Sequence, residues 1–577
     1  MRLARTAGSP ADGLCPTAFA DPVEVFIPPT PSLTRARPFR RMLGVALLAS
    51  ACLITTACGG GSAKKPPASS TAPPTVGGSP PTAPSAFPGR PNIVFVLTDD
   101  LSTDLVRFMP HVVDMERHGL TFSHYFVSDS LCCPSRASIF TGNFPHDTHI
   151  YDNFGSQGGF QAFHRRGEER HTFAVALERA GYLTAMMGKY LNGYAQAAGH
   201  VADGATTDVR ATYVPPGWNE WDVAGWGYPE FNYTLNENGV LRRYGHKPAD
   251  YLTDVLARKG VAFINGAAQS HRPFFLELAT FAPHYPYTPA PADRHDFRGL
   301  RAPRPPSFDV LPTHAPQWLA PHRPLTRREI ARIDWAFLRR VRSVQAVDRM
   351  IGQIEQTLTV DGLAGSTYLV FSSDNGLHTG EYRLMPGKLT AFDTDIRVPL
   401  VATGPGVPPD STTPLMAENV DLAETFAAIA GTRLAGDGHS LLPLLEGKSR
   451  SNWRNAVLIE HQGSPLSVRD PDYQQPASGS PTTYEAMRTD SFLYVEYADG
   501  EREFYDLRTD PFELHNVAGD LTSRQLSRLH AALRELERCH GGRACWKAMH
   551  VHTYTGNPRP SGSDTWRAAW RSLKRTS

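Results

Sequence analysis

The sequence carries almost no net charge. Its 577 residues include 58 Lys and Arg against 57 Asp and Glu, which gives a formal charge of +1 at pH 7. A chain without a basic or acidic excess has no overall electrostatic attraction to nucleic acid or to an anionic membrane surface. We therefore expect no nucleic-acid partner, and a charged ligand must be recognised by a local cluster of side chains.

Cysteine is also scarce, with seven in the whole chain. At 41% hydrophobic residues the chain can build a large core, which excludes a disulfide-stapled miniprotein, and no set of Cys and His has zinc-finger spacing. Cys132 and Cys133 are adjacent, and adjacent cysteines rarely bridge each other because of disulfide geometry. Cys539 and Cys545 are close in sequence and could close a small loop in an exported protein.

A long hydrophobic run is missing from the N-terminus. The apolar run over residues 43–57 has 15 residues, whereas a membrane span needs about 20. Arginines precede it, as in a signal peptide, and small residues lead into Cys58, which resembles a bacterial lipoprotein cleavage box with Cys58 as the lipidated residue. Cys52 is a weaker second candidate, and an uncut N-terminal anchor is the alternative. We expect a protein exported to the cell envelope, attached to the membrane only through lipid on Cys58, or otherwise secreted.

Composition divides the rest of the chain. Residues 59–90 are rich in Pro, Gly, Ser, Ala and Thr, which predicts an extended, solvated tether. The predicted organisation is therefore a leader with its signal peptide over 1–58, the tether over 59–90, a main body over 91–455 and a C-terminal subdomain with a basic tail over 456–577.

Strand and helix patterns alternate through the main body. Apolar, β-branched runs predict strands over 92–97, 183–187, 273–279 and 367–371, and apolar residues at helical spacing predict helices over 172–181 and 341–358. This alternation predicts an α/β fold with a large, mostly parallel central sheet flanked by helices. Further strands at 457–460 and 492–496 and a helix at 521–537 predict a smaller antiparallel C-terminal sheet.

Polar side chains follow four of the predicted strands. They are Asp99 and Asp100, Lys189, His284, and Asp374 and Asn375. Ligands of such sheets bind beyond the carboxyl ends of the strands, so we expect these side chains to lie together. Taken singly, an Asp pair is more often a helix cap, and a lone His or Lys a loop or surface residue. Together, their oxygen donors favour a hard cation such as Ca²⁺ or Mg²⁺ over zinc.

A cysteine motif lies between the first two strands. Residues 132–136 read Cys-Cys-Pro-Ser-Arg, and a Thr-Gly pair follows at 141–142. Cys-x-Pro-Ser-Arg followed by Thr-Gly resembles the signature of the sulfatase family, in which a partner enzyme oxidises the first cysteine to formylglycine (3-oxoalanine). The modified residue would be Cys132. The alternative is a buried cysteine pair before a helix start.

The resemblance extends from Pro91 to about Cys545. It is carried further by residues 188–192 (Gly-Lys-Tyr-Leu-Asn), 282–284 (Ala-Pro-His) and 373–380, and among sulfatases it is nearest to the N-acetylglucosamine-6-sulfatases. Endosulfatases acting on heparan sulfate share many of these features. The resemblance implies an alkaline-phosphatase-like fold and a formylglycine-generating enzyme as the maturation partner.

The resemblance also implies site roles. One calcium ion would be held by the modified Cys132 together with Asp99, Asp100, Asp374 and Asn375. Arg136 would orient the formylglycine, Lys189 and Lys388 would bind the sulfate oxygens, and His284 would protonate the leaving alcohol. Many sulfatases carry a histidine two residues after the first of these lysines, where this chain has Leu191. Asn192 or His378 could supply that missing group.

The expected function is hydrolysis of a sulfate ester on a sulfated sugar such as N-acetylglucosamine-6-sulfate. One alternative is a phosphate or phosphonate ester hydrolase of the same superfamily. A second alternative is an inactive surface lipoprotein that binds sulfated glycans, with Cys132 unconverted.

Overall fold

The structure is a computed structural model that describes residues 89–195, 209–448, 451–463 and 470–551. The predicted leader, Cys52, Cys58, nearly all of the tether and the basic tail lie outside the described residues. Within the described part of the chain, no helix has the length and apolar character needed to cross a membrane.

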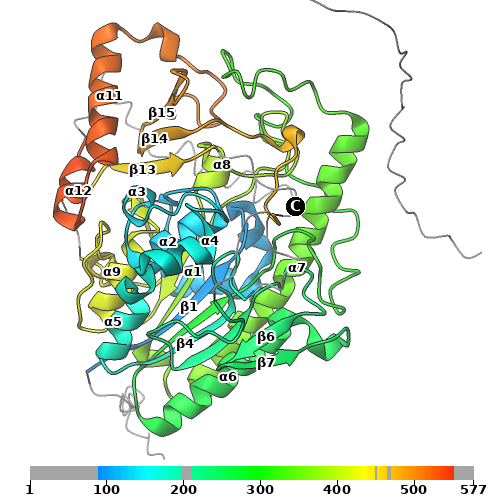
Figure 1. Ribbon diagram of the computed structural model, residues 1–577. Helices are drawn as coiled ribbons and strands as arrows, with labels where there is room; N and C mark the ends of the chain where they lie inside the picture. Colours follow the sequence, from blue (N-terminus) through cyan, green and yellow to red (C-terminus); the bar gives the residue numbers. More distant parts are fainter. Residues whose placement is uncertain (1–88, 196–208, 449–450, 464–469, 552–577) are drawn as a thin grey trace, which may run out of the picture. The chain divides into compact units, whose positions relative to one another are not determined.

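A mixed ten-stranded sheet forms the centre of the main body (Figure 1). Its order is β11-β2-β10-β9-β1-β8-β4-β5-β6-β7. The strands are β1 (Asn92–Thr98), β2 (Leu120–Phe122), β4 (Leu183–Lys189), β5 (Glu220–Ala224), β6 (Thr234–Glu237), β7 (Val240–Arg243), β8 (Phe274–Ala279), β9 (Thr367–Ser373), β10 (Leu400–Thr403) and β11 (Ser411–Thr413). The run from β9 to β5 is parallel, and antiparallel pairs flank it on both sides.

The strands at the centre of the sheet are buried on both faces. In β1, Phe95 and Leu97 pack into one hydrophobic core, and Val94 and Val96 pack into the other. A strand of this kind needs apolar side chains at every position, which is why the uninterrupted run at 92–97 predicted it correctly. The predicted α/β fold is confirmed.

Helices cover both faces of the sheet (Figure 1). The core containing Val94 and Val96 is closed by α1 (Pro110–His118), α6 (Leu252–Ser270) and α7 (Arg327–Val360). The opposite core is closed by α2 (Cys132–Thr141), α5 (Phe173–Arg179) and α9 (Asp421–Ile429).

A separate four-stranded sheet follows in the sequence. It is an antiparallel meander of β13 (Ala456–His461), β14 (Tyr484–Thr489), β15 (Phe492–Tyr497) and β16 (Arg502–Asp506), and α11 (Ser523–Glu537) and α12 (Gly542–Ala548) share its core. The smaller antiparallel sheet is therefore confirmed. A disulfide joins Cys539, in the short connection after α11, to Cys545 of α12.

Candidate active site

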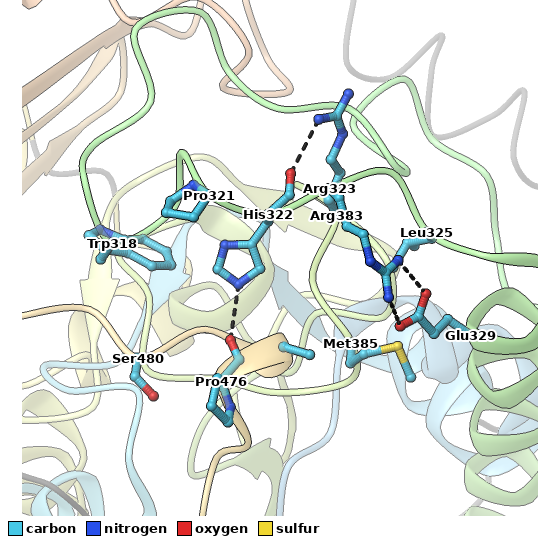
Figure 2. A pocket seen from close by; sticks show the side chains of 11 residues that line it. Trp318, Pro321, His322, Arg323, Leu325, Glu329, Arg383, Met385, Pro476 and Ser480 are labelled. Atoms are coloured by element: carbon cyan, nitrogen blue, oxygen red, sulfur yellow. Dashed lines mark hydrogen bonds and ion pairs between the residues drawn. The ribbon is translucent and has the colours of Figure 1, made fainter.

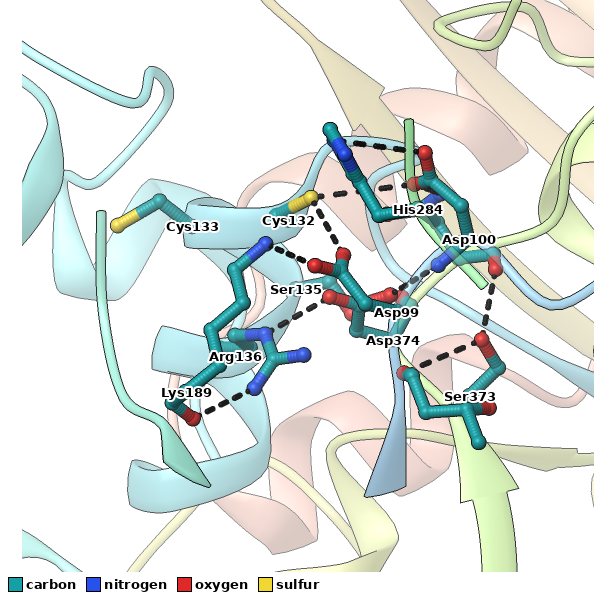
Figure 3. Close-up of polar contacts among 12 residues, drawn as sticks. Asp99, Asp100, Cys132, Cys133, Ser135, Arg136, Lys189, His284, Ser373 and Asp374 are labelled. Carbon is teal, nitrogen blue, oxygen red and sulfur yellow. Dashed lines mark hydrogen bonds and ion pairs between the residues drawn. The ribbon is translucent and has the colours of Figure 1, made fainter. Parts of the chain in front are cut away.

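The carboxyl ends of four neighbouring parallel strands meet at one edge of the central sheet. Leu97 of β1 lies opposite Ala279 of β8 and Ser372 of β9, and Gly188 of β4 lies opposite the same Ala279. The four strands therefore end at the same level. Side chains at or just after these strand ends converge in a buried cluster of Asp99, Asp100, Lys189, His284 and Asp374 (Figure 3). Asn375, also buried, follows Asp374 in the chain.

Cys132 is the first residue of α2 and points into this cluster, whereas Cys133 points away from it (Figure 3). The Sγ atom of Cys132 lies 3.2 Å from Asp99 Oδ1 and 2.8 Å from Lys388 Nζ. Burial, with the charges of Asp472 and Asp99, raises the pKa of the Cys132 thiol well above its usual value. An unmodified Cys132 is therefore a protonated thiol, which is a poor nucleophile.

Arg136 lies one helical turn after Cys132 and is fully buried. Its Nε donates to Asp374 Oδ2 at 2.7 Å, and its Nη1 donates to the Lys189 carbonyl oxygen at 2.9 Å. Burial alone would raise the pKa of Asp374, but Arg136 and the nearby lysines hold it below its usual value. Arg136 thus ties α2 to the ends of β4 and β9 and keeps an ionised carboxylate in the cluster.

The residues of this cluster can hold a metal ion. Asp99, Asp100, Cys132 and His284 each offer a ligand atom, and these atoms all lie within 4.8 Å of one another. Asn375 Nδ2 donates to Asp100 Oδ1 at 2.7 Å, while Asn375 Oδ1 is buried and has no hydrogen-bond partner among the described residues. A buried acceptor without a donor is costly, and a cation beside the carboxylates would satisfy it.

Two buried lysines neutralise the carboxylates. Lys189 Nζ lies 2.6 Å from Asp99 Oδ2, and Lys388 Nζ lies 2.6 Å from Asp100 Oδ1. Burial alone would lower their pKa values, but the neighbouring carboxylates hold both well above the usual range. Both lysines therefore present fixed positive charges beside Cys132.

His284 follows β8 and faces the same space. Its Nε2 lies 2.7 Å from Asp472 Oδ1 and 3.6 Å from Asp100 Oδ2, and its Nδ1 lies 2.7 Å from the Tyr285 carbonyl oxygen. Burial opposes protonation, but the carboxylates around the ring raise the pKa of His284 to about 9. The ring is therefore held as a proton donor at neutral pH.

Asp472 completes the cluster from a distant part of the chain, and the sequence analysis missed it. Its Oδ1 accepts from Lys388 Nζ at 2.6 Å and lies 3.6 Å from Cys132 Sγ. Its Oδ2 accepts from Asn153 Nδ2 at 2.7 Å and from Asn192 Nδ2 at 3.2 Å. Burial would raise the pKa of Asp472, but Lys388 and His284 hold it well below its usual value. Asp472 is therefore a buried anion that is paired with Lys388 and His284.

Leu191 stands two residues after Lys189, where the resemblance leads one to expect a histidine, so this chain has no histidine at that position. Of the two residues considered as substitutes, Asn192 donates to Asp472. The His378 ring lies between Asp395, 3.0 Å from Nδ1, and the Ser478 carbonyl oxygen, 3.0 Å from Nε2. Among the contacts of the described residues, neither side chain reaches Cys132 Sγ.

Comparison with known proteins defines the class. Residues 91–432, more than half of the chain, match the sulfatase family model, and residues 380–539 match the C-terminal region of N-sulphoglucosamine sulphohydrolase. The chain belongs to the sulfatase family and is a sulfuric ester hydrolase.

Proteins similar in sequence to this chain include N-acetylglucosamine-6-sulfatases. The Homo sapiens enzyme is 35% identical over 502 residues, which cover 82% of this chain and 88% of that enzyme. The Capra hircus enzyme is 35% identical over 484 residues, covering 78% of this chain and 84% of the relative.

Solved structures share the fold. A structure described as a complex with its substrate D-glucosamine-2-N,6-O-disulfate has a TM-score of 0.61 at 22% identity, covering 81% of this chain and 100% of the other. A phosphonate monoester hydrolase of Agrobacterium radiobacter has a TM-score of 0.58 at 20% identity, covering 78% and 96%. Both structures share the fold of this chain.

Proposed function

We propose that this protein hydrolyses the sulfate ester of a sulfated sugar of the N-acetylglucosamine-6-sulfate type, with formylglycine at residue 132 and a bound calcium ion. The observation that carries the proposal is the position of Cys132 Sγ, fully buried between Asp99 Oδ1 and Lys388 Nζ. The identity to N-acetylglucosamine-6-sulfatases supports the choice of sugar.

The proposed calcium site consists of Asp99, Asp100, Asp374, Asn375 and the converted residue 132. A bound calcium ion would offset the charge of the sulfate, and hydrated formylglycine would supply one hydroxyl as the nucleophile and a second for sulfate release. The chain's own residues prepare this chemistry. Arg136 holds Asp374 in place and fixes α2 at the strand ends.

The cationic side chains act on the substrate. Lys189 and Lys388 bind sulfate oxygens and stabilise the negative charge shared among them in the transition state. His284 Nε2 donates a proton to the departing sugar oxygen, which would otherwise leave as an unstable alkoxide. Both functions require the sulfate to replace Asp472 next to Lys388 and His284.

Two measurements test the proposed function. The protein is produced together with a formylglycine-generating enzyme, and mass spectrometry of tryptic peptide 118–136 shows whether residue 132 is a thiol or an aldehyde. Sulfate release from 6-sulfated N-acetylglucosamine is then compared with phosphate release from a phosphate monoester and with turnover of a phosphonate monoester. We expect the aldehyde and faster sulfate release.

The opposite results separate the alternatives. Preferred turnover of the phosphate or phosphonate ester would support the related hydrolase. A residue 132 that remains a thiol, with glycan binding and no turnover, would support the inactive binding protein.

We also propose export and a lipid anchor on Cys58. The apolar run at 43–57 and the small residues before Cys58 support this proposal. Substitution Cys58→Ala should move the protein from the membrane fraction to the soluble fraction, whereas Cys52→Ala should leave it in the membrane fraction. Retention of the Cys58 variant in the membrane would contradict the anchor.

A further inference from the structure

A second group of metal-ligating side chains lies outside the candidate active site. His146 and Asp147 belong to α3 (Pro145–Thr148), and His540 lies in the connection between α11 and α12. Each of the three offers one ligand atom, and these atoms all lie within 4.8 Å of one another. Nothing in the proposed reaction uses these side chains.

One buried carboxylate holds the two chain segments together. Asp437 Oδ2 accepts from Phe144 N at 2.9 Å, and Asp437 Oδ1 accepts from Gly541 N at 2.6 Å. Phe144 lies two residues before His146, and Gly541 directly follows His540. The backbone on both sides of the group is therefore held in place by the protein itself, as a preorganised metal site requires.

His146 is oriented by a carboxylate behind its ring. The Nδ1 atom lies 2.9 Å from Glu460 Oε2, and the Nε2 atom lies 2.8 Å from the Cys539 carbonyl oxygen. The disulfide from Cys539 to Cys545 ties down the segment that carries this carbonyl. Histidine ligands of zinc usually donate one ring N–H to a carboxylate or carbonyl and bind the metal through the other nitrogen. The Glu460 contact thus leaves His146 Nε2 for a metal, which would replace the proton directed at the Cys539 carbonyl.

His540 and Asp147 face each other across the group. His540 Nδ1 lies 2.5 Å from Asp147 Oδ1, and the rings of His146 and His540 lie edge to face with their centroids 5.6 Å apart. The His540 side chain is 69% exposed. Solvent ions can therefore reach the group, and this ring is free to turn until its bond to a metal has the usual length of roughly 2.0–2.1 Å.

The donor set of this group favours zinc over calcium. Two imidazole nitrogens and one carboxylate are typical ligands of Zn²⁺, whereas Ca²⁺ takes oxygen ligands. Three protein ligands leave the fourth position of a tetrahedral zinc ion to water. The candidate active site differs, because carboxylate and amide oxygens predominate there.

Two other histidines show how a histidine without such a setting looks. Figure 2 shows His322 in the wall of a pocket of about 470 Å³, with its Nε2 3.0 Å from the Pro476 carbonyl oxygen. His530 of α11 has a single carboxylate neighbour, and its Nδ1 lies 2.8 Å from Glu496 Oε2. Within the described part of the chain, neither histidine belongs to a group of three metal-ligating side chains.

We propose that His146, Asp147 and His540 form a zinc site that joins α3 to the connection between α11 and α12. Its function is structural, and it is independent of the calcium ion proposed for sulfate ester hydrolysis. Bound zinc would replace the hydrogen bond between His540 and Asp147 and would hold the C-terminal helices against α3.

The test is a calorimetric titration of the full chain with zinc chloride, after removal of bound metal with a chelator and reloading with calcium. The wild type should bind one zinc ion at this group. His540→Ala changes an exposed side chain, so the variant should fold, and its zinc affinity should fall at least about 100-fold because a direct ligand is lost. Glu460→Gln should weaken zinc binding about tenfold, since it changes the group that orients His146.

His530→Ala is the matched control, because it removes an exposed histidine that contacts a single carboxylate. Its zinc affinity should stay within twofold of the wild type. Cys132→Ala tests for zinc at the candidate active site and should also retain the affinity. Equal affinities of the wild type and His540→Ala, with unchanged circular dichroism, would overturn the proposal. Loss of zinc binding in Cys132→Ala would overturn it as well, by assigning the zinc to the candidate active site.

A stability measurement tests the structural function of the site. At a free zinc concentration of about 100 times the Kd, the melting temperature of the wild type and of His530→Ala should rise by about 2 °C. The melting temperature of His540→Ala should not change. A wild type that binds zinc without any rise in melting temperature would refute the structural function. None of these measurements depends on sulfate release, so a failure of the proposed function would leave their results unchanged.

Discussion

Two regions of the molecule supply the charged groups around Cys132, and they are built differently. The sheet edge presents Asp99, Asp100 and Asp374 directly after β1 and β9, which are paired along their full lengths. The facing side consists of loops, which contribute Lys388 and Asp472. Side chains at strand ends are positioned by the sheet, whereas loop side chains depend on a few cross-contacts.

The difference between sheet edge and loops suits two tasks, metal binding and substrate binding. A metal site needs ligands at fixed distances, which the sheet edge can provide. A substrate site has to exchange an internal ionic partner for the substrate, and side chains on loops are suited to this exchange. The Asp472 carboxylate, held by Lys388 and His284, is an internal partner of this kind. We therefore expect the same Asp-to-Asn substitution to have opposite effects in the two regions.

The largest effect should come from the residue between the two regions. Cys132→Ala removes the nucleophile and should lower kcat at least about 1,000-fold, in keeping with losses of other catalytic nucleophiles. Cys133→Ala is the matched control, because this neighbouring side chain is equally buried but points away from the cluster. Initial-rate sulfate release measures both. Comparable losses in both variants, with intact folding, would contradict the assignment of Cys132.

The next effect concerns the sheet edge. Asp100→Asn removes a carboxylate charge while keeping the side-chain shape, so calcium affinity and kcat/KM should each fall at least about 100-fold. Metal content after dialysis and calcium titration of activity provide the measurement. Full calcium retention in this variant would show that the cation is not bound at the ends of β1 and β9.

Asp472→Asn should act in the opposite sense. It removes the anion beside Lys388 and His284, so inorganic sulfate and the sulfated substrate should bind about tenfold more tightly, on the scale of one charged hydrogen bond. Inhibition by sulfate and the KM of the substrate measure this change, and calcium binding should stay within twofold.

Asp470→Asn is the control for this variant. Burial and the nearby Asp472 charge raise the pKa of Asp470 to about 8, so the substitution removes little charge at neutral pH. If Asp472→Asn lowers kcat and leaves sulfate inhibition unchanged, then Asp472 takes part in proton transfer and is not a competing anion.

The sheet and its edge could be predicted because their signals are local. Strands buried on both faces leave continuous apolar runs, and the polar residues directly after them mark the site. The α7 helix was predicted over 341–358 and extends over Arg327–Val360. Its start is marked by a capping box, Thr326 with Glu329, so the sequence contained a signal that could have found it.

The loop side could not be predicted in the same way. Asp472 lies in an Asp-Pro-Asp stretch with no neighbouring strand or family motif to mark it, and its meaning comes only from tertiary contacts. Arg340 is a similar case. It is buried on α7 and donates to the Asp100 carbonyl oxygen at 2.5 Å, a contact that helical periodicity cannot reveal.

The smallest effect tests how the C-terminal sheet is fastened to the main body. His146 lies in α3 (Pro145–Thr148), and its Nδ1 is 2.9 Å from Glu460 Oε2 of β13. Burial alone would lower the pKa of His146, but the hydrogen bond and charge of Glu460 raise it from 6.5 to about 9. Because the folded pKa exceeds the unfolded one, the stabilisation is complete below about pH 6.5 and disappears as the pH rises through 9.

Between pH 6.5 and 9 the free energy of unfolding should therefore decrease in both proteins or in the wild type alone. The decrease in the wild type should exceed that in His146→Gln by on the order of 1–3 kcal/mol. Denaturant unfolding at a series of pH values gives this difference. The sulfatase activity of both proteins at pH 6.5 shows whether the contact also affects the active site. Parallel stability profiles would mean that the His146–Glu460 pair does not fasten the C-terminal sheet.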